Sequence, residues 1–241
     1  NKDQSYFLCQ LSQEQLAQAK FPIGHMQKPD VRRLAEQAGL PTAAKKDSQG
    51  LCFIGKVRLP EFLQQQLAVR QGDIVEIDAA HPVFLRPHEE GIEQRSQPFA
   101  LAPEMGQVVG QHDGAHFFTV GQRKGLQVGG KAEPLFVIGT CTESNTVYVG
   151  QGDAHPGLHR NAIELEAPHW VNPSHAYEGP QSQSYELRIR YRQPLQEGEL
   201  VQTTEGRWFL DFGEHQRGIA AGQFATWYRD GELVGSAVIA R

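Results

Sequence analysis

A chain of 241 residues with 39% hydrophobic residues is long enough for two small domains and buries a substantial core. No apolar run approaches the roughly 18 residues of a membrane span, and a formal net charge of -5 disfavours general electrostatic attraction to nucleic acid. The three cysteines are widely spaced and none lies in a C-x-x-C pair. This pattern disfavours a disulfide scaffold or a structural zinc site and indicates a reducing, cytoplasmic compartment.

The first third of the sequence is predicted to be helical. A capping-box pattern opens a helix over LSQEQLAQAKF, residues 11–21. A second helix is predicted in KPDVRRLAEQAGLP, residues 28–41, because Pro29 suits its first turn and Gly39 its end. A shorter helix is predicted to begin at Pro60.

After Gly72 the sequence changes to short β runs separated by turn residues. The clearest turn is Asp230-Gly231, a pair typical of two-residue hairpins. Residues 81–107 carry four prolines and no clear period, which predicts an excursion or a flexible insert. Strands are predicted at residues 73–78, 116–122, 134–142, 146–151, 162–170, 184–193, 199–204, 207–212, 224–229 and 233–240.

Cys52 lies in KKDSQGLCFIG, residues 45–55, between a charged approach and a short apolar run. A free cysteine with apolar neighbours is usually a small buried hydrophobe. Alternatively, Lys45 and Lys46 favour the thiolate, and Gly50 lets the backbone turn the sulfur toward a cleft. A thiolate attacks electrophiles or carries sulfur. The residue types alone leave both hypotheses open.

Five stretches occur in one order along the chain: KDQSYFLCQL at 2–11, FPIGHMQKPDVRRLAEQAGLP at 21–41, KKDSQGLCFIG at 45–55, FFTVGQRKGLQVGG at 117–130 and RIRYRQ at 188–193. Together they resemble the tRNA-specific 2-thiouridylases, the MnmA or TrmU family. The resemblance covers nearly the whole chain apart from the proline-rich insert. The motifs K-D-Q-S-Y-F-L, G-L-C-F-I-G and G-Q-R-K-G-L carry it most specifically.

The resemblance implies the activity of a tRNA-uridine 2-sulfurtransferase, which transfers sulfur to the wobble uridine of tRNA. In the family, ATP adenylates the oxygen on carbon 2 of the uracil, and a cysteine that matches Cys52 delivers sulfur to this carbon from a persulfide. A second cysteine completes the reaction, either through a disulfide or by assisting attack. The implied partners are tRNA and a persulfide-donor protein of a sulfur relay, and no membrane is implied.

The family's ATP-binding domain, with its S-G-G-x-D-S phosphate loop, has no counterpart in these residues. The second cysteine belongs to the same domain. We therefore expect that ATP is bound by a missing N-terminal domain. The chain, which opens on Asn1, is then a C-terminal fragment that does not thiolate tRNA alone. Cys9 and Cys141 are predicted to be structural fill.

The expected fold class is α+β, mainly β, with a short helical N-terminal segment. Residues 1–55 are expected to form the C-terminal end of the catalytic domain, with the cysteine loop. Residues 56–158 are expected to form a small β-rich central domain that contains the insert 81–107. Residues 159–241 are expected to form an antiparallel β-barrel similar to domain two of translation elongation factors.

Strand alternation divides SYELRIRYRQ, residues 184–193, into an apolar face with Tyr191 and a face with three arginines. Arginines at a spacing of two suit phosphate oxygens, although a solvated outer barrel face gives the same pattern. The resemblance assigns tRNA contacts to Arg190 and Tyr191. Since Tyr191 falls on the apolar face, its contact requires the strand to end or twist there.

Further tRNA contacts are implied by the resemblance at Lys2, Asp3, Gln4 and Gln223. On its own, Gln223 is an ordinary turn residue before a strand. The basic loop GQRKG, residues 121–125, either contacts phosphate or forms a plain exposed hairpin. No metal site is predicted, because the histidines are scattered and a structural zinc site needs four converging ligands.

Two other function classes stay open. A stand-alone tRNA-binding β-barrel module does no chemistry and has no need of Cys52. A soluble thiol-redox protein is disfavoured by the absence of a C-x-x-C pair.

Overall fold

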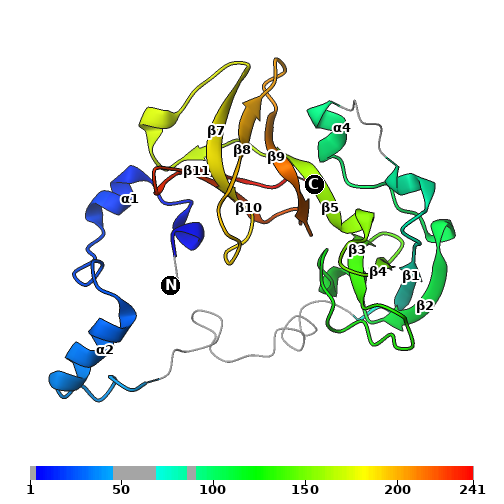
Figure 1. Cartoon of the computed structure of the whole chain (residues 1–241), viewed down its shortest axis with the longest axis horizontal. Helices are drawn as coiled ribbons and strands as arrows, with labels where there is room; N and C mark the ends of the chain where they lie inside the picture. Colours follow the sequence, from blue (N-terminus) through cyan, green and yellow to red (C-terminus); the bar gives the residue numbers. More distant parts are fainter. Residues whose placement is uncertain (1–3, 46–68, 86–90, 241) are drawn as a thin grey trace. The chain divides into compact units, whose positions relative to one another are not determined.

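The computed structural model describes residues 4–45, 69–85 and 91–240. The chain divides into two compact units, one formed by residues 1–13 with 69–241 and the other by residues 14–68. Figure 1 labels the α-helices and most of the strands. None of the helices in the described segments is long and apolar enough to cross a membrane.

The smaller unit contains helix α2 (Lys28–Gln37), which confirms the helix predicted at 28–41. Gly39 ends it in a left-handed conformation with φ of +64°, and the Leu40 N–H donates back to the Ala35 carbonyl at 2.9 Å. Helix α1 (Gln13–Gln18) is shorter than the predicted 11–21. The helix predicted from Pro60 lies outside the described residues.

A four-stranded sheet lies within the larger unit. Its strands are β1 (Gly72–Glu76), β2 (Gln107–His112), β3 (Leu135–Cys141) and β4 (Thr146–Gln151). The order is β2-β1-β4-β3, with β1 parallel to β4 and the other pairs antiparallel. Strands β1, β3 and β4 confirm the strands predicted at 73–78, 134–142 and 146–151.

Both faces of this sheet are buried. Successive residues Ile74 and Val75 of β1 enter opposite cores, as the pleat of a strand requires. One core also contains Leu126, Leu135, Val137, Val147 and Val149. The other contains Ile77, Phe84, Ile138, Tyr148 and Leu158.

Residues 81–107 were predicted to be an excursion or a flexible insert, and the described ones form a packed excursion between β1 and β2. They form the short helices η2 (Pro82–Phe84), α4 (Ile92–Ser96) and η3 (Pro103–Met105). Their apolar side chains cover the second core, namely Val83, Phe84, Phe99, Leu101 and Met105. These residues follow no period because they reach the sheet from turns and short helices, which repeat at no fixed interval.

The strand predicted at 116–122 is wrong, and strand β2 was missed. Residues Ala115–Phe117 form the short helix η4, and the segment that follows bonds to β3 only at its end. There the Gly121 N–H donates to the Val137 carbonyl at 2.7 Å, and the Val137 N–H donates to that of Gln122 at 2.9 Å. Strand β2 escaped prediction because its alternation is weak and Gly110 interrupts it.

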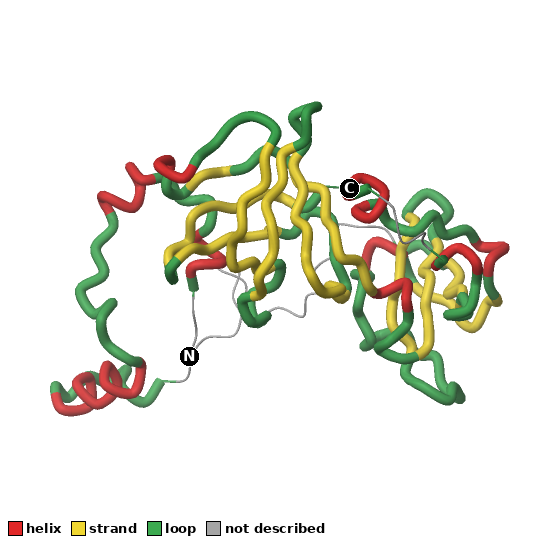
Figure 2. Tube along the Cα trace, turned by 45° about the horizontal axis from the view of Figure 1, so that its top comes forward, coloured by secondary structure: helices red, strands yellow, loops and turns green. Residues whose placement is uncertain are grey.

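Seven strands form the larger sheet of the same unit: β5 (His159–Leu165), β6 (His169–Trp170), β7 (Gln181–Arg188), β8 (Gln196–Gln202), β9 (Trp208–Arg217), β10 (Phe224–Arg229) and β11 (Glu232–Val238). The order is β5-β9-β8-β7-β10-β11-β6, and every pair is antiparallel. Leu165 bridges to Ile239, just beyond β11, so the sheet curls back on its first strand. Figure 2 shows this curl, which confirms the predicted antiparallel β-barrel.

In strands β7 and β9 the barrel core follows the period-two alternation of a strand. Tyr185 and Leu187 of β7 and Leu210 and Phe212 of β9 point inward and are almost fully buried. The hairpin between β10 and β11 turns at Asp230-Gly231, with φ of +52° and +78°. Positive φ at both positions is the type I′ geometry that this pair favours, which confirms the predicted turn.

Two predicted barrel strands are too long. The strand predicted at 162–170 is divided into β5 and β6 by Pro168, which has no N–H to donate to a ladder. The strand predicted at 184–193 ends at Arg188. The Gln193 side chain accepts a hydrogen bond from the Ile189 N–H at 3.1 Å, so the chain turns instead of continuing.

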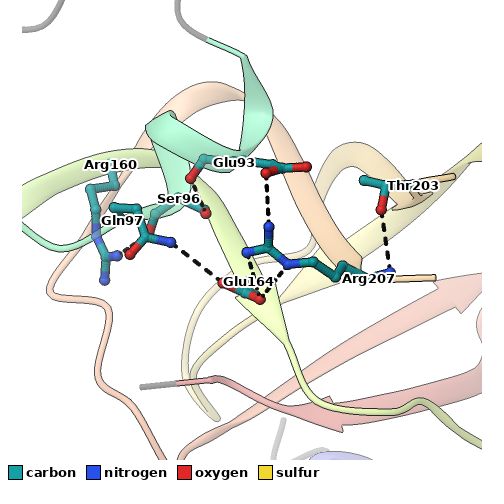
Figure 3. Close-up of polar contacts among 7 residues, drawn as sticks. All are labelled: Glu93, Ser96, Gln97, Arg160, Glu164, Thr203 and Arg207. Atoms are coloured by element: carbon teal, nitrogen blue, oxygen red, sulfur yellow. Dashed lines mark hydrogen bonds and ion pairs between the residues drawn. The ribbon is translucent and has the colours of Figure 1, made fainter. Parts of the chain in front are cut away.

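Ion pairs join helix α4 to the barrel (Figure 3). Arg207 at the start of β9 bonds to Glu93 of α4 at 2.8 Å and to Glu164 of β5 at 2.9 Å. Arg95 of α4 also donates two hydrogen bonds to the Asp211 carboxylate, at 2.8 and 2.5 Å. Bidentate geometry makes this pair stronger than an ordinary surface ion pair. The insert therefore ties the central sheet to the barrel.

The short helix η5 (Pro156–Leu158) leads from the central sheet into the barrel, and His155 caps it. The imidazole is buried, with 3% of its residue surface exposed. Its Nδ1 accepts from the Gly157 N–H and its Nε2 lies 3.1 Å from the Ile77 carbonyl. Burial lowers the pKa of His155, although the Ile77 carbonyl and the Asp78 carboxylate act in the opposite direction.

Acidification is expected to destabilise the fold through this histidine. Because the pKa is lower in the folded than in the unfolded chain, the stabilisation is complete above about pH 6.5 and decreases as the pH falls toward the folded pKa. We predict that the Tm falls between pH 7 and pH 5, and that H155N falls less steeply. A difference of about 1 kcal/mol corresponds to about 2–4 °C in a chain of this size.

The matched control is H25N, which makes the same exchange at an exposed histidine of the smaller unit. Buried His112 titrates in the same direction, so the difference between wild type and H155N isolates one residue. Parallel curves for wild type and H155N would contradict the assignment. Scanning calorimetry at each pH provides the measurement.

Candidate nucleic-acid interface

The N-terminal segment is fastened to one side of the barrel by side-chain hydrogen bonds. The short helix η1 (Ser5–Leu8) begins this segment. The Ser5 hydroxyl lies 3.0 Å from the Tyr228 hydroxyl, and the Gln10 amide donates to the Ser236 hydroxyl at 2.7 Å. The Ser236 hydroxyl donates in turn to the Cys9 carbonyl at 2.7 Å. Residues 5–10 thus become part of the barrel surface.

Tyr6 connects this segment to two strand ends of the barrel. Its hydroxyl donates to the Phe224 carbonyl at 2.9 Å and reaches the Ile189 carbonyl at 3.3 Å. Burial is the main cause that raises the pKa of Tyr6, so the phenol keeps the proton that these bonds need. One side chain therefore joins three segments that are remote in sequence.

Two residues flank these contacts on the barrel side. Tyr191 follows the end of β7, and its ring lies 4.5 Å from the ring of Phe7 between centroids. Gln223 immediately precedes β10, and its carbonyl accepts from the Ile239 N–H at 2.8 Å. Gln4 precedes η1 and is exposed, while its carbonyl accepts from the Phe7 N–H at 3.0 Å.

Arg190 lies in a slot between two glycine turns. Its Nη2 donates to the Gly218 carbonyl, and Gly218 has a φ of +63°. A Cβ built on Gly218 would lie 2.5 Å from this nitrogen, and one on Gly121 would lie 3.3 Å from it. Only residues without a side chain let both turns approach so closely. The Gly121 turn begins the basic loop GQRKG, so this loop lies beside Arg190.

The guanidinium of Arg190 is half-buried. Burial lowers the pKa of Arg190, and the neighbouring charge of Arg217 lowers it further. An arginine keeps its charge in spite of such shifts. Arg217 itself lies over the Phe136 ring, with its Cζ 4.4 Å from the centroid. Two positive charges therefore stand close together beside the Tyr6 contacts. Arg192 is exposed and follows Arg190 by two residues, and Arg123 is exposed and follows Gly121 by two residues.

The outer face of the barrel has the opposite charge. A groove of about 840 Å³ crosses strands β7 to β10 and includes Tyr185, Tyr228 and Arg229 in its lining. In this groove Glu186 lies directly opposite Glu197, and Glu199 lies directly opposite Asp211, on neighbouring strands. Asp211 is paired with Arg95, whereas the carboxylates of Glu186 and Glu197 repel each other and repel phosphate. An anionic polymer is therefore expected to avoid this face.

Two described cysteines differ in environment. Cys9 is almost fully buried, and burial raises the pKa of its thiol, so the predicted structural role agrees with its position. Cys141 ends β3 and is only partly buried, where it lines a cavity of about 400 Å³ between the central sheet and the barrel. Hydrogen bonding from Ser144 lowers the pKa of Cys141.

Comparison with known proteins identifies the family. Three family models match: the tRNA methyl transferase HUP domain over residues 1–56, the tRNA methyl transferase PRC-barrel domain over 90–151, and the aminomethyltransferase beta-barrel domain over 160–239. Proteins named tRNA-specific 2-thiouridylase MnmA are 52% identical in Flavobacterium johnsoniae and 50% identical in Christiangramia forsetii, each over 99% of this chain. The chain belongs to the MnmA/TrmU family. It spans 62% of the length of these two relatives.

A relative with lower sequence identity also matches nearly the whole chain and is likewise spanned only in part. The protein of the same name from Pseudomonas aeruginosa is 38% identical over 99% of this chain, which spans 56% of that relative. The PRC-barrel match includes most of the region predicted to be an insert outside the resemblance. That exclusion was therefore wrong, in agreement with the packing of this region on the central sheet.

Four predicted contact residues of the family lie around Tyr6 in the described structure. Gln4, Arg190, Tyr191 and Gln223 belong to the three segments that its hydroxyl joins. Cys52, Lys2 and Asp3 lie outside the described residues, so their roles stay predictions. In the part of the chain that is described, no group of three or more His, Cys, Asp or Glu residues is arranged to hold a metal ion.

The straight ribbon of three arginines predicted on 184–193 is wrong. Because β7 ends at Arg188, the three arginines do not continue along one strand face, and their side chains have different surroundings. Arg188 lies over the Tyr228 ring, with its Cζ 5.5 Å from the centroid, whereas Arg190 enters the glycine slot. Tyr191 lies beyond the end of the strand, so strand alternation no longer assigns it to the apolar face. Its predicted tRNA contact required the strand to end or twist at this point.

Sequence reasoning missed Tyr6, Phe7 and Arg217. Tyr6 and Phe7 belong to the K-D-Q-S-Y-F-L motif, so the motif itself was a signal, but it gave neither residue a role. Arg217 carries no local signal in EHQRG. Its place beside Arg190 depends on pairing of β9 with β5, which brings Arg217 opposite His159.

Removing one hydroxyl should loosen the N-terminal segment. We predict that Y6F lowers the free energy of unfolding by about 1–3 kcal/mol, because the Phe224 carbonyl loses its donor and the Ile189 carbonyl loses its weaker contact with the same hydroxyl. Amide hydrogen exchange in residues 5–11 should become faster. The matched control is Y177F, which removes a similar bond of 2.7 Å to the Leu200 carbonyl within the barrel. Y177F should lower the free energy of unfolding by a similar amount without changing amide exchange in residues 5–11. Unchanged exchange of these residues in Y6F would refute the role of Tyr6.

Proposed function

We propose that this chain is the part of a tRNA-uridine 2-sulfurtransferase that docks tRNA and carries the sulfur. The observation that carries the proposal is the convergence at Tyr6. Its hydroxyl joins the segments that hold Gln4, Arg190, Tyr191 and Gln223. Residues from opposite ends of the sequence gather where the family resemblance predicts tRNA contacts.

Charge supports RNA as the ligand at this end of the barrel. Arg190 and Arg217 provide fixed positive charge, and the exposed loop residues Arg123 and Lys124 begin beside the glycine slot. Guanidinium groups suit phosphate oxygens. The carboxylate groove on strands β7 to β10 makes the outer face unfavourable for the same polymer. A net charge of -5 is therefore compatible with RNA binding at one end only.

The sulfur chemistry is assigned to Cys52 on the family resemblance. ATP transfers its adenylyl group to the oxygen on carbon 2 of the uracil and releases pyrophosphate. The terminal sulfur of a Cys52 persulfide then attacks carbon 2, and the carbon–oxygen bond breaks with departure of AMP. A second thiolate attacks the Cys52 sulfur and cleaves the sulfur–sulfur bond. The products are 2-thiouridine and a disulfide, which needs a two-electron reductant before the next turnover.

This mechanism requires partners beyond the chain. The chain spans 62% of the length of the Flavobacterium johnsoniae and Christiangramia forsetii relatives, and we assign ATP binding and the second cysteine to a segment that these residues do not include. A persulfide-donor protein loads Cys52. With tRNA as the substrate, we place the reaction in the cytoplasm.

Reconstitution tests the proposal. The chain is combined with the segment of the Flavobacterium johnsoniae relative that it does not match, then with ATP, a persulfide donor and unmodified tRNA. We predict that 2-thiouridine forms with the wild-type chain and falls at least about a hundredfold with C52S, as loss of a covalent catalyst requires. Nucleoside mass spectrometry measures the product, and a separate binding assay measures the affinity for tRNA.

The matched control is C141S, which removes a partly exposed thiol away from the Tyr6 contacts and should leave product unchanged. Equal product from wild type and C52S would exclude the persulfide role. If neither gave product while both bound tRNA, the alternative of a stand-alone tRNA-binding β-barrel module would be favoured.

A further inference from the structure

An exposed aromatic side chain stands at the centre of the proposed interface. Phe7 is 61% exposed, although its neighbour Tyr6 is buried. Its ring meets the edge of Tyr6 at a centroid distance of 5.7 Å and lies on Tyr191 at 4.5 Å, with an interplanar angle of 41°. Two other rings therefore hold the Phe7 ring in place while most of its surface remains open to solvent.

The support beneath this ring is rigid. Phe7 belongs to η1, and the Tyr6 hydroxyl ties that helix to the Phe224 and Ile189 carbonyls. Tyr191 belongs to the turn held by Gln193, whose amide also donates to the Gln216 side chain at 2.7 Å. An aromatic surface that is fixed before binding loses little conformational entropy when a flat ligand stacks on it.

The charges around the rings indicate which class of ligand fits this surface. Arg190 and Arg192 flank Tyr191 in sequence, and Arg217 stands beside Arg190. Proteins that hold single-stranded nucleic acid combine a positive groove for the backbone with aromatic rings on which bases stack. An apolar protein partner would gain nothing from the arginines, and a paired base in a duplex has no free face.

We propose that Phe7 and Tyr191 form a stacking platform for one unpaired base of the bound RNA. The proposal rests on the proposed function for the identity of the ligand and adds the way in which it is held. Phe7 receives the base on its exposed surface, Tyr191 supports the Phe7 ring, and the arginines bind the adjacent phosphates. Sequence-specific RNA recognition commonly uses unstacked loop bases in this manner.

The test uses the full chain and an RNA stem-loop that carries 2-aminopurine at one loop position at a time. Stacking on an aromatic ring quenches the fluorescence of this base. We predict quenching at a single loop position with wild type and with F7Y, which keeps the ring. F7L should abolish the quenching and weaken binding by about five- to a hundredfold. Because F7L removes no charge, the slope of log K against log salt should not change.

Two variants make the result specific. F21L removes a phenylalanine with a similar exposure of 63% in the smaller unit and should change neither quenching nor affinity. R192Q removes an exposed charge and should reduce the salt slope while the quenching persists.

Two outcomes would overturn the platform, and they are distinguishable. If wild type bound no stem-loop RNA, the platform and the docking part of the proposed function would both fail. If wild type bound RNA but F7L retained full quenching and affinity, the platform alone would fail. The exposed surface of Phe7 would then be assigned to packing against another part of the protein.

Discussion

The buried phenol of Tyr6 is the interaction on which the interface depends. A tyrosine brings its hydroxyl into a protein interior only where the group finds a hydrogen-bond partner. Here the partners are carbonyls at the end of β7 and the start of β10, 183 and 218 residues away along the chain. The bond places the first described residues on the barrel, so Gln4 and Phe7 share a surface with Tyr191 and Gln223. Without it, the barrel end would hold only half of the proposed contact set.

The charge of the barrel differs between the end where η1 docks and the outer face. The barrel presents arginines at the end where η1 docks and repelling carboxylates on the outer face of β7 to β9. One of these carboxylates, Asp211, is neutralised by Arg95 of helix α4. The insert thus fastens the barrel to the central sheet through the acidic side and leaves the basic end available. The glycine slot extends the basic end, because Gly121 comes from the central region and Gly218 from the barrel.

Local patterns predicted the parts of the fold that local chemistry determines. Many short strands at hairpin spacing predicted a β-barrel, the Asp230-Gly231 pair predicted one of its turns, and Pro29 with Gly39 predicted α2. The end of β7 was not predictable, because it depends on a hydrogen bond between Gln193 and Ile189 that competes with the ladder. The packing of residues 91–105 was missed for a related reason, since loop side chains on a sheet face follow no period. For the site, the motifs predicted which residues matter, whereas the contacts of Tyr6 and Arg190 join distant segments that no local pattern relates. The role of Cys52 was predicted from motif and resemblance alone, and it stays a prediction.

In the proposed function, RNA docks where η1 meets the barrel. Ultraviolet crosslinking of bound tRNA, followed by mass spectrometric mapping of the linked peptides, tests it most directly. We predict crosslinks in residues 4–8, 189–193 and 217–224 together, because Tyr6 and Arg190 hold these segments side by side. Crosslinks confined to the carboxylate groove on strands β7 to β10, with none near Tyr6, would contradict it.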